Sequence, residues 1–200
     1  MENRQPERKE RTSRRKERVL QVLAQRQPDL TLVLANIHDP HNVSAIYRSC
    51  DAFGLLAVHL YYTDTPFPIL SKKTSASARK WVETVRHRDL HDLQSSLTGY
   101  QILVTNCSPE AKPLGSFDLT VPTAIVMGNE HRGVEVELAS IATAELYIPM
   151  YGMIQSFNVS VAAAIILAEA ARQRQLVGLY AHPRFDAEHM QQLAADWLER

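Results

Sequence analysis

The sequence predicts an α/β fold in which helices cover an open parallel sheet. Segments with the apolar pattern of strands alternate with segments of helical periodicity along the 200 residues. The segment at 30–35 is an apolar run, as expected of a strand that is buried on both faces of a parallel sheet. Polar clusters follow several apolar segments, and ligands of such folds bind beyond the carboxyl ends of the strands.

The first half of the chain begins with an amphipathic helix at 7–26, which Pro28 and Asp29 end. After the strand at 30–35, Asn42 is expected to cap a helix that Gly54 ends. The elements expected next are a strand at 56–61, a loop with one short helix at 62–78, a strand at 81–85 and a helix at 88–97.

The second half continues the alternation. The expected elements are strands at 102–105, 123–127 and 145–148, an irregular connection at 107–118, and helices at 133–141, 158–176 and 186–198. We divide the chain into a basic N-terminal helical arm (1–28), an α/β domain (29–178) and a C-terminal helical extension (179–200).

Composition limits the compartment and the class of protein. No apolar run reaches the length of a membrane span, and the charged N-terminus lacks the apolar region of a secretory signal. The two cysteines, Cys50 and Cys107, provide no disulfide framework. These features predict a cytoplasmic protein without a membrane partner.

Basic residues are concentrated at the N-terminus although the formal net charge is zero. Residues 1–26 contain nine Lys and Arg residues against four Glu residues. A basic arm on a mildly acidic body attracts polyphosphate locally. A solvated helix face that serves solubility explains the same charges equally well at this stage.

Three segments combine glycine or asparagine with reactive polar residues, at 42–54, 125–133 and 148–160. The last of these places Gln155, Ser156, Asn158 and Ser160 between two apolar elements, where a plain core has no use for them. No G-x-G-x-x-G or Walker A sequence is present, which disfavours the ordinary dinucleotide and nucleoside-triphosphate folds.

These three segments resemble the motifs of the SpoU/TrmH branch of the SPOUT methyltransferases, which methylate RNA 2′-hydroxyls. The resemblance runs from the Arg-rich start through Arg-Gln-Pro-Asp-Leu at 26–30 to Ala-Asp-Trp-Leu at 195–198. It implies a Rossmann-like SPOUT fold with a C-terminal trefoil knot and helical extensions at both ends. It further implies S-adenosyl-L-methionine as methyl donor, no metal, and a homodimer.

The resemblance also implies a cofactor site. Its expected contacts are Thr105, Gly128, Ile148, Met150, Met153, Ser156 and Asn158. Ile148 and the two methionines are expected to form an apolar slot, and Gly128 and Gly152 to allow close backbone approach. Taken singly, each methionine is better explained as a gap-filling core residue. The glycines are also explained as turn residues, which is compatible with cofactor binding.

The residues expected to act on the ribose are Arg48, Asn42, Glu130, Ser156 and Asn158. The resemblance implies that Arg48 acts on the 2′-hydroxyl, either as base or by binding the adjacent phosphate and stabilising the alkoxide. Asn42 and Asn158 are helix caps with a second role at the substrate. Ser156 is expected to contact the ligand, and Glu130 to pair with Arg48 or Asn42.

Positive groups at several places are expected to contact RNA phosphates. They are Arg15, Arg18, His41, Arg79, Arg172 and Arg174, with Lys72, Lys73 and Lys80 beside Arg79 in sequence. His38 is interpreted as structural. Exposed aromatic residues for stacking are few, so we expect recognition of tRNA shape.

The predicted function is therefore 2′-O-methylation of tRNA at the D-loop guanosine of position 18. The same chemistry on ribosomal RNA is one alternative, although the short basic helix favours tRNA. A non-catalytic RNA-binding protein with this fold is a second alternative. A small-molecule α/β enzyme is a third, and it leaves the basic arm unexplained.

Overall fold

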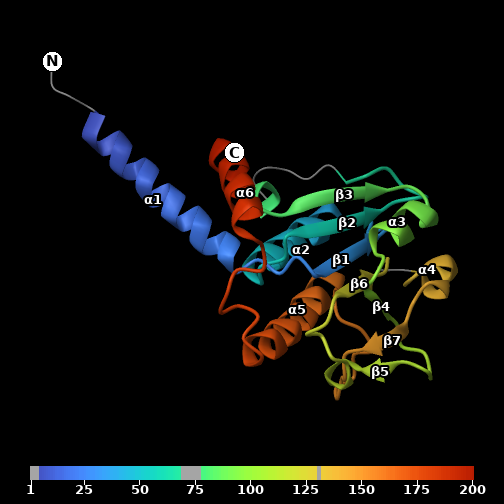
Figure 1. The fold of residues 1–200 in the computed structure, drawn as a ribbon. Coiled ribbons are helices and arrows are strands. Elements are labelled where there is room, and N and C mark those ends of the chain that lie inside the picture. Colours follow the sequence, from blue (N-terminus) through green and yellow to red (C-terminus); the bar gives the residue numbers. More distant parts are fainter. Residues whose placement is uncertain (1–4, 69–77, 130–131) are drawn as a thin grey trace.

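A parallel sheet forms the centre of the computed structural model, which describes residues 5–68, 78–129 and 132–200 (Figure 1). The seven strands within these residues pair in the order β3-β2-β1-β6-β4-β7-β5, and every pairing is parallel. The strands are β1 (Leu30–Ala35), β2 (Ala57–Tyr61), β3 (Glu83–His87), β4 (Gln101–Thr105), β5 (Lys112–Pro113), β6 (Thr123–Met127) and β7 (Ala144–Tyr147). The predicted parallel α/β sheet is confirmed.

The prediction of a doubly buried first strand is also confirmed. All six residues of β1 and all five of β6 are buried. Leu32 and Leu34 of β1 point into one apolar cluster, whereas Val33 and Ala35 point into a second cluster on the opposite face. Alternate side chains of a strand lie on opposite faces, so the central strands supply both layers of core.

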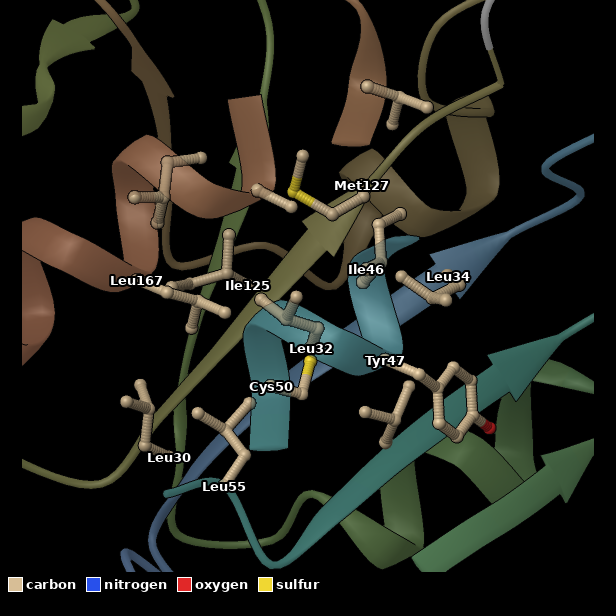
Figure 2. Close-up of a cluster of buried hydrophobic side chains, with 14 of the residues drawn as sticks. Leu30, Leu32, Leu34, Ile46, Tyr47, Cys50, Leu55, Ile125, Met127 and Leu167 are labelled. Carbon is tan, nitrogen blue, oxygen red and sulfur yellow. The ribbon is translucent and has the colours of Figure 1, made fainter. Parts of the chain in front are cut away.

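Helices cover both faces of the sheet. They are α1 (Gln5–Ala24), α2 (Pro40–Ala52), α3 (Leu90–Ser96), α4 (Val136–Ser140), α5 (Val159–Leu176) and α6 (Ala187–Glu199), with the short 3-10 helices η1 (Ala78–Lys80) and η2 (Leu114–Ser116). The helices α2 and α5 pack on one face, where Ile46, Cys50 and Leu167 meet the side chains of β1 and β6 (Figure 2). Leu93 of α3 and Leu138 of α4 belong to the cluster on the other face.

Several boundaries differ from the predicted ones. The strand predicted at 81–85 is β3 at 83–87, because the 3-10 helix η1 occupies 78–80. The irregular connection at 107–118 contains the two-residue strand β5 and the helix η2, which are too short to give a periodic signal. The helix expected at 133–141 is reduced to α4 at 136–140.

The predicted cap of α2 is wrong. Asp39 is the N-cap, and its carboxylate accepts a hydrogen bond from the backbone N–H of His41 at 2.8 Å. Pro40 occupies the first helical position, where the missing N–H costs nothing and the fixed φ suits the helix. Asn42 therefore lies inside the first turn, and its side chain is not required for capping.

The N-terminal arm joins the C-terminal extension through a third apolar cluster. Val19 and Leu23 of α1 pack against Leu193, Ala194 and Trp197 of α6, beside each other in Figure 1. Within the described ranges, no helix is long and apolar enough to cross a membrane.

Arg26 connects this pair of helices to the α/β body. Its buried guanidinium lies 5.0 Å from the centre of the Trp197 ring and forms an ion pair with Asp51 of α2 at 2.5 Å. It also donates to the carbonyl oxygen of Leu55 at 2.8 Å. A single side chain thus contacts α2, the start of the β2 segment and α6.

Two buried histidines form a hydrogen-bonded chain with a carboxylate at the β2–β3 edge. Nδ1 of His59 lies 2.8 Å from Nε2 of His87, and Nδ1 of His87 lies 2.6 Å from Oδ2 of Asp92. An ionised carboxylate only accepts hydrogen bonds, so a neutral His87 donates to Asp92 and accepts from His59. Burial, and after it the nearby His87, lowers the pKa of His59 to about 4.

This lowered pKa predicts that the protein loses stability in mild acid. The unfolded chain takes up a proton at this position below about pH 6.5, whereas the folded chain resists protonation down to about pH 4. His59 should thus reduce the free energy of unfolding by about 2 kcal/mol between pH 6.5 and 4.5. Urea unfolding of His59→Asn, which retains a donor near Nδ1, should show a correspondingly shallower pH dependence. Equal slopes for variant and wild type would contradict this assignment.

Candidate active site at the carboxyl edge of the sheet

A cavity of about 440 Å³ opens where β4, β6 and β7 end. Its size is typical of small-molecule sites. Six of the seven predicted cofactor contacts line it, namely Thr105, Gly128, Ile148, Met150, Ser156 and Asn158. These residues come from three loops and the start of α5, and the parallel strands bring them to one edge of the sheet.

The lining divides into an apolar part and a polar part. Met127, Leu146 and Ile148 supply apolar surface from the ends of β6 and β7. Gln155 and Ser156 supply polar groups from the segment before α5, where both residues are exposed. The Thr105 hydroxyl is already engaged, since it donates to the carbonyl oxygen of Val126 at 3.0 Å.

Met153 lies outside this cavity, contrary to the prediction that it lines the apolar slot. Its side chain is 99% exposed, and neighbouring Tyr151 and Ile154 are also exposed. The segment between β7 and α5 runs along the surface there without regular structure, which turns these side chains outward. Of the two methionines predicted to form the slot, Met150 is the one that lines the cavity.

Gly128 is required by the fold of its own loop. A Cβ atom at this position would lie 2.4 Å from the carbonyl carbon of Gly133 and 2.5 Å from the backbone nitrogen of Val134. Two backbone hydrogen bonds between Asn129 and Gly133, each of 2.9 Å, hold the loop in this closed form. The predicted close approach is thus to another part of the loop, and Gly152 has open space around its Cα.

A pair of asparagines connects the cavity to α2. Nδ2 of Asn158 donates to Oδ1 of Asn42 at 3.1 Å. Oδ1 of Asn158 accepts from the backbone N–H of Ser160 at 2.9 Å and thereby caps α5, as predicted. We refer to the Asn42–Asn158 hydrogen bond as the asparagine contact. One side chain of the cavity wall therefore touches the first turn of the helix that carries Arg48.

Arg48 itself does not line the cavity of its own chain. It lies on the exposed side of α2, off the buried face of Val43, Ile46, Tyr47 and Cys50, as expected from its helical position. His41, seven residues earlier, falls on the same exposed side. The described residues offer the Arg48 guanidinium no hydrogen-bond acceptor or ion-pair partner.

Glu130, which was predicted to pair with Arg48 or Asn42, lies outside the described residues, as do Lys72 and Lys73.

Asn129 is held by a hydrogen-bond network that the sequence analysis did not predict. Asn129 donates to the backbone carbonyl of Asn36 at 2.6 Å, and Asn36 donates to Glu135 at 2.6 Å. Asn36 has a φ of 47°, a conformation that asparagine tolerates better than most residues. The sequence signal for this network was Asn36, an asparagine directly after the buried strand β1.

The predicted phosphate contacts occupy different environments. Arg15, Arg18, His41 and Arg79 are exposed. Arg172 is also exposed but forms hydrogen bonds with Glu169 on its own helix, and these lower the pKa of that carboxyl to about 2.

The prediction that Arg174 contacts RNA is wrong, because its side chain is fully buried. It forms an ion pair with Asp29 at 2.6 Å and donates to the carbonyl oxygens of Leu119 and Val121 at 2.8 and 3.0 Å. Burial opposes ionisation of Asp29, but hydrogen bonds and charges of Arg174 and Arg184 outweigh it and lower the carboxyl pKa. Arg174 thus connects α5 to the segments that precede β1 and β6.

Arg174→Met should reduce stability far more than Arg172→Met. Loss of the buried guanidinium removes hydrogen bonds from three carbonyl oxygens and takes one of two arginine partners from the Asp29 carboxylate, and should cost about 3–5 kcal/mol. Arg172→Met should leave the unfolding free energy close to that of wild type, because the residue is exposed. Urea unfolding at pH 7 measures both, and similar losses would refute the structural role of Arg174.

The loop geometry predicts a matching contrast between two glycines. Gly128→Ala should lower the free energy of unfolding by about 2 kcal/mol or more, because its methyl group would overlap backbone atoms. Gly152→Ala should change it by less than about 0.5 kcal/mol. Denaturation of the two variants under the same conditions tests this difference, and equal values would contradict the closed loop.

Known proteins resemble this chain in both sequence and fold. The sequence profile described as the SpoU rRNA Methylase family matches residues 29–168. A tRNA (guanosine(18)-2′-O)-methyltransferase of Thermus thermophilus is 45% identical over 194 residues, which cover 96% of this chain and all of that protein. The crystal structure of the A. aeolicus TrmH/SpoU tRNA modifying enzyme has a TM-score of 0.88 at 37% identity, covering 94% of this chain and 96% of that one. An AdoMet-bound rRNA methyltransferase from Sinorhizobium meliloti has a TM-score of 0.61 at 28% identity, covering 76% and 59%. The chain therefore belongs to the SpoU/TrmH family of RNA methyltransferases.

Proposed function

We propose that this protein transfers a methyl group from S-adenosyl-L-methionine to the ribose 2′-hydroxyl of the D-loop guanosine at tRNA position 18. The similarity to tRNA (guanosine(18)-2′-O)-methyltransferases, which extends over nearly the whole chain, sets the substrate class. The observation that carries the proposal is the asparagine contact, which joins the cavity wall at Asn158 to the helix of Arg48. Family membership also implies the C-terminal trefoil knot.

The cavity suits the proposed methyl donor. Its apolar wall, which includes Leu146 and Ile148, fits the adenine ring, and Gln155 and Ser156 offer hydrogen bonds to polar groups. The cofactor supplies a methyl group that its sulfonium already activates, so the protein's task is to align donor and acceptor.

The acceptor ribose would lie beside the asparagine contact. Asn158 is exposed, and Nδ2 has a second N–H that can be presented to a hydroxyl beside Asn42. An arginine guanidinium donates hydrogen bonds and keeps its proton at neutral pH. We therefore assign Arg48 to the adjacent phosphate and the developing alkoxide, whose charge a bidentate donor stabilises while the hydroxyl proton passes to that phosphate or to water.

We further propose that two copies of the chain form the active unit. Arg48 does not line the cavity of its own chain, so a site complete with arginine is most simply made with a second copy. Exposed apolar side chains are available for such a contact on the segment before α5 and on α5 itself. These residues are Tyr151, Met153, Ile154 and Val161. Burying them between copies would remove apolar surface from water.

The basic side of α1 would contact the tRNA outside the site. Arg15 and Arg18 are exposed, and the N-terminal part of α1 projects away from the α/β body (Figure 1). In this proposal residues 1–28 and 179–200 form an RNA-binding arm for the catalytic domain of residues 29–178. The two free cysteines and the tRNA substrate fit a reducing cytoplasm.

Methyl transfer to unmodified tRNA transcripts tests the proposal. Wild type should place a 2′-O-methyl group on the D-loop guanosine. Arg48→Ala should lower kcat by about 100-fold or more, because the alkoxide loses its donor, with little change in cofactor affinity. Lys112→Ala, which removes an exposed cation from the edge strand β5, should retain wild-type activity.

Mapping the methylated nucleotide and titrating the cofactor complete this experiment. Transfer to ribosomal RNA but not to tRNA would replace the proposed substrate. Full activity of Arg48→Ala would remove the proposed role of this arginine. Absence of both transfer and cofactor binding would leave a non-catalytic RNA-binding protein.

A further inference from the structure

A second hollow, of about 380 Å³, opens at the same edge of the sheet between the segments that follow β1 and β2. Rings form most of its walls, with Pro40 from the first segment and Pro66, Phe67 and Pro68 from the second. We call this hollow the ring-lined slot. Proline and phenylalanine rings present flat, rigid apolar surfaces, which are suited to a planar ligand.

Positive groups lie next to two residues of the slot, Phe67 and Pro40. The guanidinium carbons of Arg88 and Arg86 lie 4.6 and 5.6 Å from the centre of the Phe67 ring, and both side chains are exposed. His41 is exposed one residue beyond Pro40. An aromatic wall edged by arginines is the combination that proteins use for nucleotides, because the ring stacks on the base and the cations attract its phosphates.

The slot also contains an unused polar group. The Thr65 hydroxyl is buried and has no hydrogen-bond partner among the described residues. A buried hydroxyl without a partner costs free energy, and most such groups in folded proteins are paired. A ligand with donors or acceptors on its edge, such as a nucleobase, would satisfy Thr65 on entering the slot.

The position of the slot relates it to the methylation site. Pro40 is the first residue of α2, and Asn42 follows about 3 Å further along the helix axis. Asn42 forms the asparagine contact with Asn158 at the donor cavity. The first turn of α2 thus contributes Pro40 to the slot and Asn42 to the contact with the cavity wall.

We propose that the ring-lined slot receives the base of the nucleotide whose ribose is methylated. This inference rests on the proposed function. It adds a binding site for the target base after that base has unstacked from its neighbours in the tRNA. Phe67 and the prolines stack on the base, Thr65 bonds its edge, and Arg86 and Arg88 attract the flanking phosphates. Readout of an unstacked base in this manner is common in RNA recognition.

Steady-state methylation of a tRNA transcript by the full-length protein tests the slot. Phe67→Leu should lower kcat/KM for tRNA by about 10-fold or more, the effect typical of losing a stacking ring. Thr65→Val, which replaces the hydroxyl by a methyl group, should lower it several-fold. Phe117→Leu is the matched control, because Phe117 is also half-buried against the same apolar cluster but lies outside the slot. Cofactor affinity and thermal stability should be alike in the Phe67 and Phe117 variants.

A transcript with 2-aminopurine at the acceptor position identifies the occupant. Binding to wild type should change its fluorescence, and Phe67→Leu should abolish that change. The inference is overturned if Phe67→Leu and Thr65→Val both behave like Phe117→Leu on an active wild-type background. A fluorescence response confined to 2-aminopurine at a neighbouring nucleotide would also overturn it, in favour of a flanking base. A wild type that does not methylate tRNA would instead refute the proposed function, and the slot assignment with it.

Discussion

The common direction of the strands is the constraint on which this structure depends. Because every pairing in the sheet is parallel, all carboxyl ends lie along one edge. The loops after β4, β6 and β7 enclose the donor cavity there, and the loops after β1 and β2 enclose the ring-lined slot. The common strand direction is therefore enough to bring both hollows to the same edge of the sheet, although their segments are distant in sequence.

The asparagine contact joins the wall of the cavity to the first turn of α2, and Pro40 of the same turn lines the slot. Asn158 uses its carbonyl oxygen to cap α5 and its amide N–H groups to reach Asn42. The capping role of Asp39 leaves the Asn42 side chain available for that contact. This hydrogen bond orients the two amide side chains on helices that the apolar core already packs together. Their orientation matters because misplacement by about 1 Å can cost 100-fold in rate.

The sequence predicted the features that depend on local patterns. Apolar runs identified the central strands. The six predicted contacts that line the cavity were implied by the resemblance of the motifs to the SpoU/TrmH family. The asparagine cap of α5 was predicted because its capping signal is contained in a few residues. The equally local Asp39–Pro40 signal at α2 was available but was overlooked in favour of Asn42.

Features that depend on distant partners could not be predicted in this way. Arg174 resembles any exposed arginine at the end of a helix until Asp29, 145 residues earlier, is placed against it. The slot forms because β1 and β2 are neighbours, which brings Pro40 near Phe67. Met153 belongs to a motif that predicts a binding loop, but the motif does not specify which side chains face the cavity.

The central claim is that the asparagine contact couples the donor cavity to the acceptor site. A double-mutant cycle on kcat/KM for tRNA tests it with Asn42→Ala and Asn158→Ser, since serine still caps α5 but is too short to reach Asn42. We expect each single variant to lose about 10-fold or more, and the double variant to lose little beyond the more impaired single variant. Losses that simply multiply would show that the two residues act independently and would contradict the account.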